Sequence, residues 1–171
     1  FLGEHPDTNI PGIEFISGSL GHGIAVAIGF ALNSVLDSTP YNTYVVMGDG
    51  ECGEGSVWEA ASLASHLNLS NLVVIVDRNG LCIHGITDKI NALEPLDKRF
   101  ESFGWNVVTI DGHDFEEMSQ SLRLLHPTKP TAVIANTIKG KGVSFMENKS
   151  SWHHGAIGDQ ELSIAIEELS K

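Results

Sequence analysis

The chain has 171 residues, a length that suits one α/β domain with an ordinary core and hardly two. Its formal net charge of −12 at pH 7 argues against a nucleic-acid partner, because phosphate binding depends on lysine and arginine; an acidic surface more often serves solubility. No apolar run reaches the roughly 20 residues of a membrane span and no leader peptide is visible, so we expect a cytoplasmic protein without membrane contact.

Two details of the composition bear on the state of the chain. It begins with Phe1 rather than Met, which suggests a fragment or the ordered part of a longer polypeptide. Its two cysteines, Cys52 and Cys82, do not form a CxxC pair. We expect two buried free thiols, with one disulfide as the alternative.

Helix and strand patterns alternate along the chain. The expected elements, in order, are a buried helix at 19–36, a strand at 43–47, a helix at 56–67, a strand at 72–76, a turn at 77–80, a helix at 95–104, a strand at 106–110, a helix at 114–125, a strand at 131–136 and an amphipathic helix at 157–171. Apolar strands separated by helices predict a mostly parallel sheet with helices on both faces. The chain is therefore expected to be a single doubly wound α/β domain over residues 1–171.

Polar side chains follow two of these strands at the point where each strand ends. Asp49 lies two residues past the strand at 43–47, and Asn79 lies three residues past the strand at 72–76. If the strands are neighbours, both side chains point into the crevice beyond the carboxyl ends of the sheet, where ligands collect. Each offers an oxygen atom to a hard cation such as Mg²⁺, which shares about six ligands between protein, water and phosphates.

The glycines around Asp49 suit a phosphate group. Gly48, Gly50 and the glycines at 53 and 55 let the backbone come close to phosphate, just ahead of a helix N-terminus near Ser56 that favours anions. Taken singly, "GDG" and "DRNG" are more simply read as tight turns. Together, with strand, helix and strand between them, they favour a cation held between the Asp49 carboxylate and a diphosphate.

The stretch "GDGECGEGSVWEA…NLVVIVDRNG" resembles the thiamine-diphosphate motif, in which GDG is followed about 25–30 residues later by Asn. Outside the motif, "GIEFISGSLGHGIAVAIGFAL", "RFESFGWNVVTIDGHD" and "KPTAVIANTIKGKGVSFMENKSSWHHG" resemble transketolase, particularly its separately encoded N-terminal subunit. The resemblance runs from His5 to about Leu169. It implies the thiamine-diphosphate-binding fold and, within it, the domain that binds the diphosphate.

The resemblance implies a cation site built from three residues. Asp49 and Asn79 match the ligands of Mg²⁺, or of Ca²⁺ or Mn²⁺ in its place, and the carbonyl of Leu81 matches the third protein ligand. The positions that match contacts to the cofactor itself are Gly50 and Glu51 at the diphosphate, Gly18 and Leu20 at the aminopyrimidine side, and Ile83 at the thiazolium.

Three histidines are candidates for proton transfer by the same resemblance. His5, in "GEHPD", matches a residue that hydrogen-bonds the sugar near its carbonyl, although a solvated histidine near a chain end is the plain alternative. The segment "WHHG" offers His153 and His154 for a family residue near the diphosphate and the substrate. We favour His153 because it follows the Trp directly.

Two acids are candidates for a contact between subunits. Glu54 and Glu59 match acids that, in transketolases, meet their counterparts across the dimer axis and link two active sites. The plain alternative is that Glu54 begins a helix and Glu59 is solvated.

Two departures from the family pattern concern what this chain lacks. Family members carry some 60–100 residues ahead of "GEHPD", and the glutamate that activates the cofactor belongs to a separate pyrimidine-binding domain. A single α/β domain of this length has no room for that domain. We therefore expect, as partner, a C-terminal subunit that carries the pyrimidine-binding domain, in a heterotetramer with two copies of each chain.

The resemblance implies transfer of a two-carbon ketol unit from a ketose to an aldose, with thiamine diphosphate and Mg²⁺ as cofactors and a sugar or sugar phosphate as substrate. With only 10 lysines and arginines, recognition of a substrate phosphate is expected elsewhere. Two alternatives stay open. One is another thiamine diphosphate enzyme, such as the α-type component of a 2-oxoacid dehydrogenase or a specialised acyl or ketol transferase. The other is a non-catalytic assembly module, against which the intact Asp49 and Asn79 speak.

Overall fold

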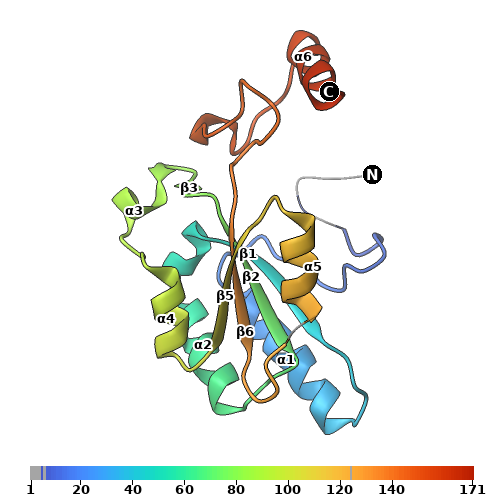
Figure 1. Cartoon of the computed structure of the whole chain (residues 1–171), viewed down its shortest axis with the longest axis vertical. Helices are drawn as coiled ribbons and strands as arrows, with labels where there is room; N and C mark the ends of the chain where they lie inside the picture. The colour runs from blue at the N-terminus through green and yellow to red at the C-terminus, as the bar shows by residue number, and fades with distance from the viewer. Residues whose placement is uncertain (1–4, 6, 124) are drawn as a thin grey trace.

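The computed structural model describes residue 5, residues 7–123 and residues 125–171 of the chain (Figure 1). Four parallel strands form the main sheet in the order β1–β2–β6–β5. Their bounds are β1 Thr43–Gly48, β2 Leu72–Arg78, β6 Thr131–Asn136 and β5 Asn106–Asp111. Because all four strands run the same way, their carboxyl ends meet at one edge of the sheet, the upper edge in Figure 1.

One face of the sheet carries three helices and most of the core. These are α1 (Gly23–Leu36), α2 (Gly55–His66) and α4 (Leu96–Ser102), whose apolar side chains form one core cluster with Leu72, Val74 and Val76 of β2. Phe100 of α4 is fully buried, with ring centroids 5.1 Å from Trp58 and 5.5 Å from Trp105. This face is a closed hydrophobic core.

The other face carries a single helix, α5 (Phe115–Arg123), which packs over Val73, Ile110 and Val133. It does not cover β1, where the side chain of Val46 is 71% exposed although its neighbour Met47 is buried on the first face. The run at 43–47 is therefore an edge strand with alternating exposure, not one buried on both sides.

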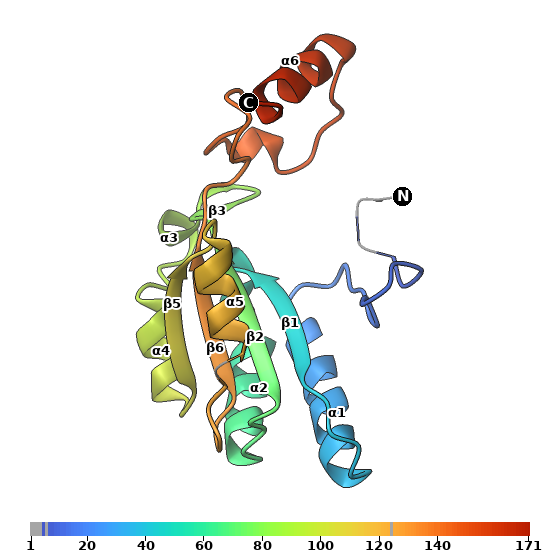
Figure 2. The same cartoon turned by 45° about the vertical axis from the view of Figure 1, so that its right-hand side comes forward.

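Short elements and an extended arm surround the carboxyl edge. A 3₁₀ turn, η1 (Gly50–Gly53), follows β1, and the hairpin β3–β4 (Leu81–Cys82 and Gly85–Ile86) and helix α3 (Thr87–Ile90) follow β2. After β6, residues 139–171 form an arm, here called the C-terminal arm, that contains η2 (Ser150–Trp152) and α6 (Asp159–Leu169). Figures 1 and 2 show this arm projecting beyond the carboxyl ends of the strands.

The structure confirms the predicted α/β class and the order of the helices and strands, with shifted ends. The first helix begins at Gly23 rather than at residue 19, because Gly21 has a φ of +80°, which an α-helix does not allow. Strand β2 continues through Arg78, two residues into the predicted turn, because Asp77 and Arg78 still pair with β6. The 3₁₀ turns, the β3–β4 hairpin and α3 were not predicted.

The expectations about cysteines and membranes are also answered. Cys52 and Cys82 are free thiols, so the disulfide alternative is wrong; Cys52 is buried and Cys82 is half-buried. Burial raises the pKa of the Cys52 thiol to about 12, with further contributions from the carboxylates of Glu51, Asp49 and Glu94. In the described part of the chain, no helix has the length and apolar character to cross a membrane.

Candidate active site

The strands that precede Asp49 and Asn79 are neighbours in the sheet, as the predicted site requires. Gly48 at the end of β1 pairs with Asp77 of β2, and the Asp49 N–H donates to the Asp77 carbonyl at 3.1 Å. The Asp49 carboxylate accepts the Gly80 N–H at 2.8 Å through Oδ2 and the Gly50 N–H at 2.9 Å through Oδ1. The turn after β1 and the turn after β2 are thus joined directly by this side chain.

Asp49 is a buried acid that forms no ion pair with a lysine or arginine in the described part of the chain. Its side chain is 3% exposed, and burial raises the pKa of its carboxyl, as does the nearby Asp77 carboxylate. The N–H groups of Gly80 and Gly50 act in the opposite direction, as does the nearby Thr87 hydroxyl. The Arg78 guanidinium lines the same cavity but pairs with Glu94, so a bound divalent cation is the kind of group that would balance the Asp49 charge.

The oxygen atoms around Asp49 suit a hard cation. Asn79 Oδ1 accepts the Leu81 N–H at 3.0 Å, which holds the amide in a tight turn next to the Gly80 contact. Thr87 Oγ1 is buried without a hydrogen-bond partner of good geometry in the described part of the chain. No cluster of three or more His, Cys, Asp or Glu side chains forms among the described residues, so a cation here would rely on carboxylate, amide and carbonyl oxygens. Those are the ligands that Mg²⁺ prefers, and the residues present fit it.

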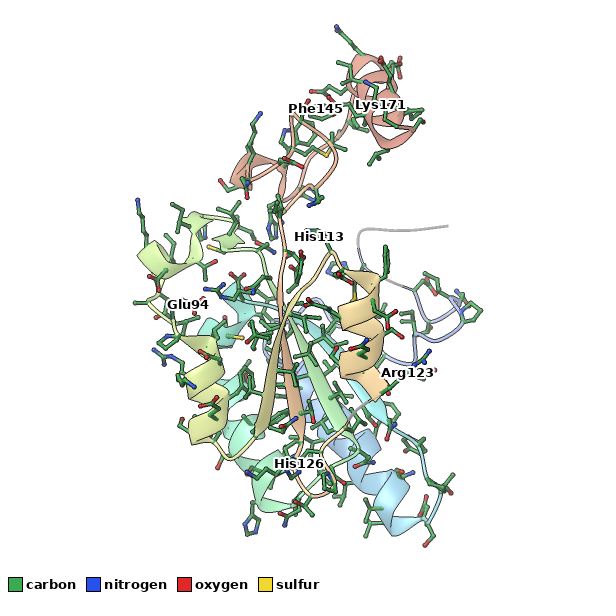
Figure 3. All side chains as sticks on the ribbon, viewed as in Figure 1. Glu94, His113, Arg123, His126, Phe145 and Lys171 are labelled. Carbon is green, nitrogen blue, oxygen red and sulfur yellow. The ribbon has the colours of Figure 1, made fainter. Side chains whose placement is uncertain are left out.

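A cavity of about 500 Å³ opens at this edge of the sheet, and Asp49, Asn79 and Thr87 are among the residues that line it. Arg78 also lines it and was not predicted from the sequence. Its Nε donates to Glu94 Oε1 at 2.6 Å, and its Nη1 donates to Asn136 Oδ1 at 2.8 Å. Arg78 therefore ties the end of β2 to the end of β6 and to the segment before α4, where Figure 3 labels Glu94.

The loop before α1 lies against the glycine turn. Glu51 accepts the Gly21 N–H at 2.9 Å and the Gly48 N–H at 3.2 Å, one with each carboxylate oxygen. Gly18 lies against His5: a Cβ atom built on Gly18 would stand 3.3 Å from the imidazole Nε2. The structure thus brings His5 and the 18–21 loop to the same side of the turn.

Several predicted cofactor contacts are exposed around the site. Leu20 is 54% exposed and Ile83, in the connection between β3 and β4, is 61% exposed. Gly50 packs closely on this hairpin, since a Cβ atom on it would stand 3.0 Å from the Cys82 Cβ. Apolar side chains with this exposure are available to contact a ligand or a partner chain.

The two histidines of "WHHG" lie on the C-terminal arm, and both are exposed. The pKa of His153 is lowered, first by partial burial and then by the charges of Lys139 and His154. Lys139 is a second residue that sequence reasoning missed, although the repeated lysines of "KGKG" were a visible signal. At the root of the arm, the Ile138 N–H donates to His113 Nε2 at 2.8 Å, and Figure 3 shows His113 at this position.

Glu54 and Glu59 are both exposed, on the surface that begins at the N-terminus of α2. Glu54 is the N-cap residue of α2, and its own N–H donates to the Glu51 carbonyl at 3.0 Å. Their position on the outside of the molecule is compatible with either reading, a solvated face or a contact between subunits.

Comparison with known proteins gives a consistent result. Residues 2–170 match the protein family described as "Transketolase, thiamine diphosphate binding domain". The chain is 43% identical over 172 residues to an apulose-4-phosphate transketolase subunit of Phocaeicola vulgatus, covering 99% of this chain and 61% of the relative. It is 40% identical to the 6-deoxy-6-sulfo-D-fructose transketolase subunit SqwG of Clostridium sp., covering 94% of this chain and 59% of the relative.

Solved structures agree with these sequence relatives. The crystal structure of transketolase from Campylobacter jejuni superposes with a TM-score of 0.88 at 33% identity, over 97% of this chain and 27% of that one. The chain therefore spans about six-tenths of the length of the two transketolase subunits and about a quarter of the Campylobacter jejuni enzyme.

Proposed function

The chain belongs to the transketolase family through its thiamine diphosphate binding domain, and from this we propose that it binds the diphosphate end of thiamine diphosphate and serves ketol transfer from a ketose to an aldose. The observation that carries the proposal is the buried Asp49 carboxylate, joined through the Gly80 N–H to the turn that holds Asn79. A buried carboxylate that forms no ion pair with the described residues is suited to bind a divalent ion.

In this proposal, Asp49, Asn79 and the Leu81 carbonyl would hold Mg²⁺, which would supply positive charge to the diphosphate. Gly48 and Gly50 let the backbone approach the phosphates, while Gly18, Leu20 and Ile83 contact the remainder of the cofactor. When bound, thiamine diphosphate supplies the thiazolium C2 that attacks the ketose carbonyl. The residues of this chain would position the cofactor, because anchoring its diphosphate also holds the thiazolium C2 in one place.

His5 and the histidines of the arm are proposed to handle protons. His5 lies against Gly18, and its match to a family histidine supports a hydrogen bond from its imidazole to the sugar near its carbonyl. A lowered pKa keeps His153 neutral at pH 7, so its imidazole can accept a proton from a sugar hydroxyl. Of the two arm histidines, His153 is favoured because it follows Trp152 directly.

A partner polypeptide is part of the proposal. The relatives described above are named as subunits, and residues 2–170 match a thiamine diphosphate binding domain. We propose a C-terminal subunit with the pyrimidine-binding domain as partner, in a heterotetramer with two copies of each chain. In this assembly, Glu54 and Glu59 would meet their counterparts across the dimer axis. The substrates named for the relatives, a sugar phosphate and a sulfosugar, support a sugar with an anionic group as substrate.

The test is cofactor binding by Asp49→Ala in the assembled enzyme. With thiamine diphosphate and Mg²⁺ at about 100 times the dissociation constant, the native complex should gain roughly 2.7 kcal/mol of stability in a thermal melt. Asp49→Ala should lose this gain, whereas Asp37→Ala, an exposed acid just past α1, should retain it. Equal gains in both variants would refute the ligand assignment. Activity assays with ketose phosphates and with 2-oxoacids then separate ketol transfer from the alternative thiamine diphosphate chemistry.

A further inference from the structure

The N-terminal segment joins the body of the domain at Gly21. Residues 7–20 are exposed or half-buried, and Gly21 is the first buried residue in the described part of the chain. Its N–H donates to Glu51 Oε1 at 2.9 Å, and its carbonyl accepts the Ser56 hydroxyl at 3.1 Å. Both main-chain groups of Gly21 are therefore held by residues of the "GDGECGEGS" segment.

The Glu51 carboxylate makes two contacts at once. While Oε1 accepts the Gly21 N–H, Oε2 accepts the Gly48 N–H at 3.2 Å, at the last residue of β1. One side chain thus bridges the loop before α1 and the turn after β1. Hydrogen bonds to an ionised acceptor are roughly twice as strong as those between neutral groups, so this bridge is a firm one.

The backbone at Gly21 leaves room for no other residue. Its φ is +80°, and a Cβ atom there would stand 2.6 Å from both Glu54 Cβ and Ser56 Oγ. The loop therefore rests directly on the start of α2. The close packing of Gly21 and the three hydrogen bonds of Glu51 and Ser56 therefore hold the 18–21 loop against residues 48–56. This contact is here called the joint.

We infer that Glu51 and Ser56 are positioning residues, which hold the 18–21 loop at a set distance from the Asp49 turn. The inference rests on the proposed function and adds to it. In that function the loop carries Gly18 and Leu20 toward one end of the cofactor, and the Asp49 turn holds the other end. The Glu51 carboxylate and a diphosphate are both anionic and repel each other, so Glu51 acts through the loop whose Gly21 N–H it accepts. His5 lies on Gly18, so the joint also sets the place of that imidazole.

Hydrogen exchange on the full chain tests the joint without any cofactor. Glu51→Gln keeps the side-chain size but replaces one of the two acceptor oxygens with an NH₂ group and removes the charge. One of the Gly21 and Gly48 amides therefore loses its acceptor and should exchange about tenfold faster, and the other keeps a weaker, neutral acceptor and should exchange faster by a smaller factor. Ser56→Ala frees only the Gly21 carbonyl and should accelerate exchange at Gly21 by a smaller factor. Glu101→Gln, an exposed acid on α4, is the matched control and should change neither amide.

The outcomes of the exchange experiment are distinct. Retained protection of the β6 amides shows that a variant is folded; if Glu51→Gln is not, Ser56→Ala carries the test. Gly21 exchange equal to that of the native chain in every folded variant would overturn the inference. Faster exchange confined to Gly21 and Gly48 would support it.

Cofactor titration of the assembled enzyme tests the consequence. Glu51→Gln should raise the Kd for thiamine diphosphate about tenfold, lower kcat at saturating cofactor by a smaller factor, and leave the Mg²⁺ requirement at its native value. A direct diphosphate or metal contact would instead shift the Mg²⁺ requirement together with the affinity, and that result would contradict the positioning role. Failure of the native enzyme to bind the cofactor would refute the proposed function, while the exchange result would still report on the joint.

Discussion

The body of the domain, residues 21–136, and the C-terminal arm, residues 139–171, differ in how their apolar side chains are used. The body buries a continuous core on the first face of its sheet and a smaller one beneath α5. The arm, all of which the structure describes, buries only Val143 and Ala165, and three apolar residues of α6 (Leu162, Ile166 and Leu169) are 46%, 58% and 65% exposed. Figure 2 shows the arm standing clear of the helices that cover the sheet.

The positions of the candidate residues are held to different degrees in these two regions. Asp49 and Asn79 follow strands whose register is set by a buried core, so their relative position depends on the whole body. His153 belongs to a segment held by a few local contacts, such as the ring pair of Phe145 and Trp152 at 5.2 Å and the Ser144 hydrogen bond to Glu168. The proposed cation site is built into the domain, whereas the arm histidine depends on a separate and weaker unit.

The largest expected effect is in the body. Ile134 of β6 is 2% exposed in the core of the first face, so Ile134→Ala should lower the free energy of unfolding by about 4 kcal/mol, through lost burial and the cavity left behind. Urea denaturation of the full chain measures it. Ile134→Val, the matched control, should cost about 1 kcal/mol. A loss below about 1 kcal/mol for the alanine variant would mean that the body is no better packed than the arm.

Much of the body could be predicted from the sequence, because the signals there are local. Apolar runs such as 72–76 mark the strands, and the position of Asp49 just past one of them places it at the carboxyl edge. Strand order was not predictable: Val46 and Met47 are both apolar, yet one is exposed and the other buried because β1 lies at an edge. Which face a helix covers is decided by packing between distant segments.

The roles of Arg78 and Glu51 show the limits of reading a motif. The sequence offers no sign that Glu51 accepts the Gly21 N–H, since the two residues are 30 apart and meet only after α1 and β1 are in place. Arg78 lies in a segment that the sequence predicts as a turn, although its guanidinium connects Glu94 and Asn136. Contacts of this kind come from tertiary structure, which local patterns do not encode.

A smaller effect is expected for a substitution that destabilises the C-terminal arm alone and leaves the body of the domain folded. Trp152→Ala removes the ring contact with Phe145, which is worth about 0.5–1.5 kcal/mol beyond its area, and should speed amide exchange at His153, whose N–H donates to the Ser150 carbonyl. The urea midpoint of the body should stay unchanged. If that midpoint falls along with the arm protection, arm and body unfold as one unit and the distinction between them is wrong.

The smallest expected effect is a change in the titration of His153, which sharpens the contrast between an arm residue in contact with solvent and a body residue such as Asp49. Partial burial, Lys139 and His154 lower the pKa of His153 from its ordinary value of 6.5, because each disfavours the imidazolium. The folded state then binds this proton less readily than the unfolded chain, so the free energy of unfolding falls slightly as pH drops from 6.5 through the lowered pKa. Lys139→Met should move the pKa part of the way back up, as followed by NMR titration of the imidazole Cε1–H, whereas Lys171→Met at the far end of the arm should not. Identical titration curves for the two variants would show that Lys139 does not act on His153 in solution, and the arm would then be too loosely held to set the protonation of its own histidine.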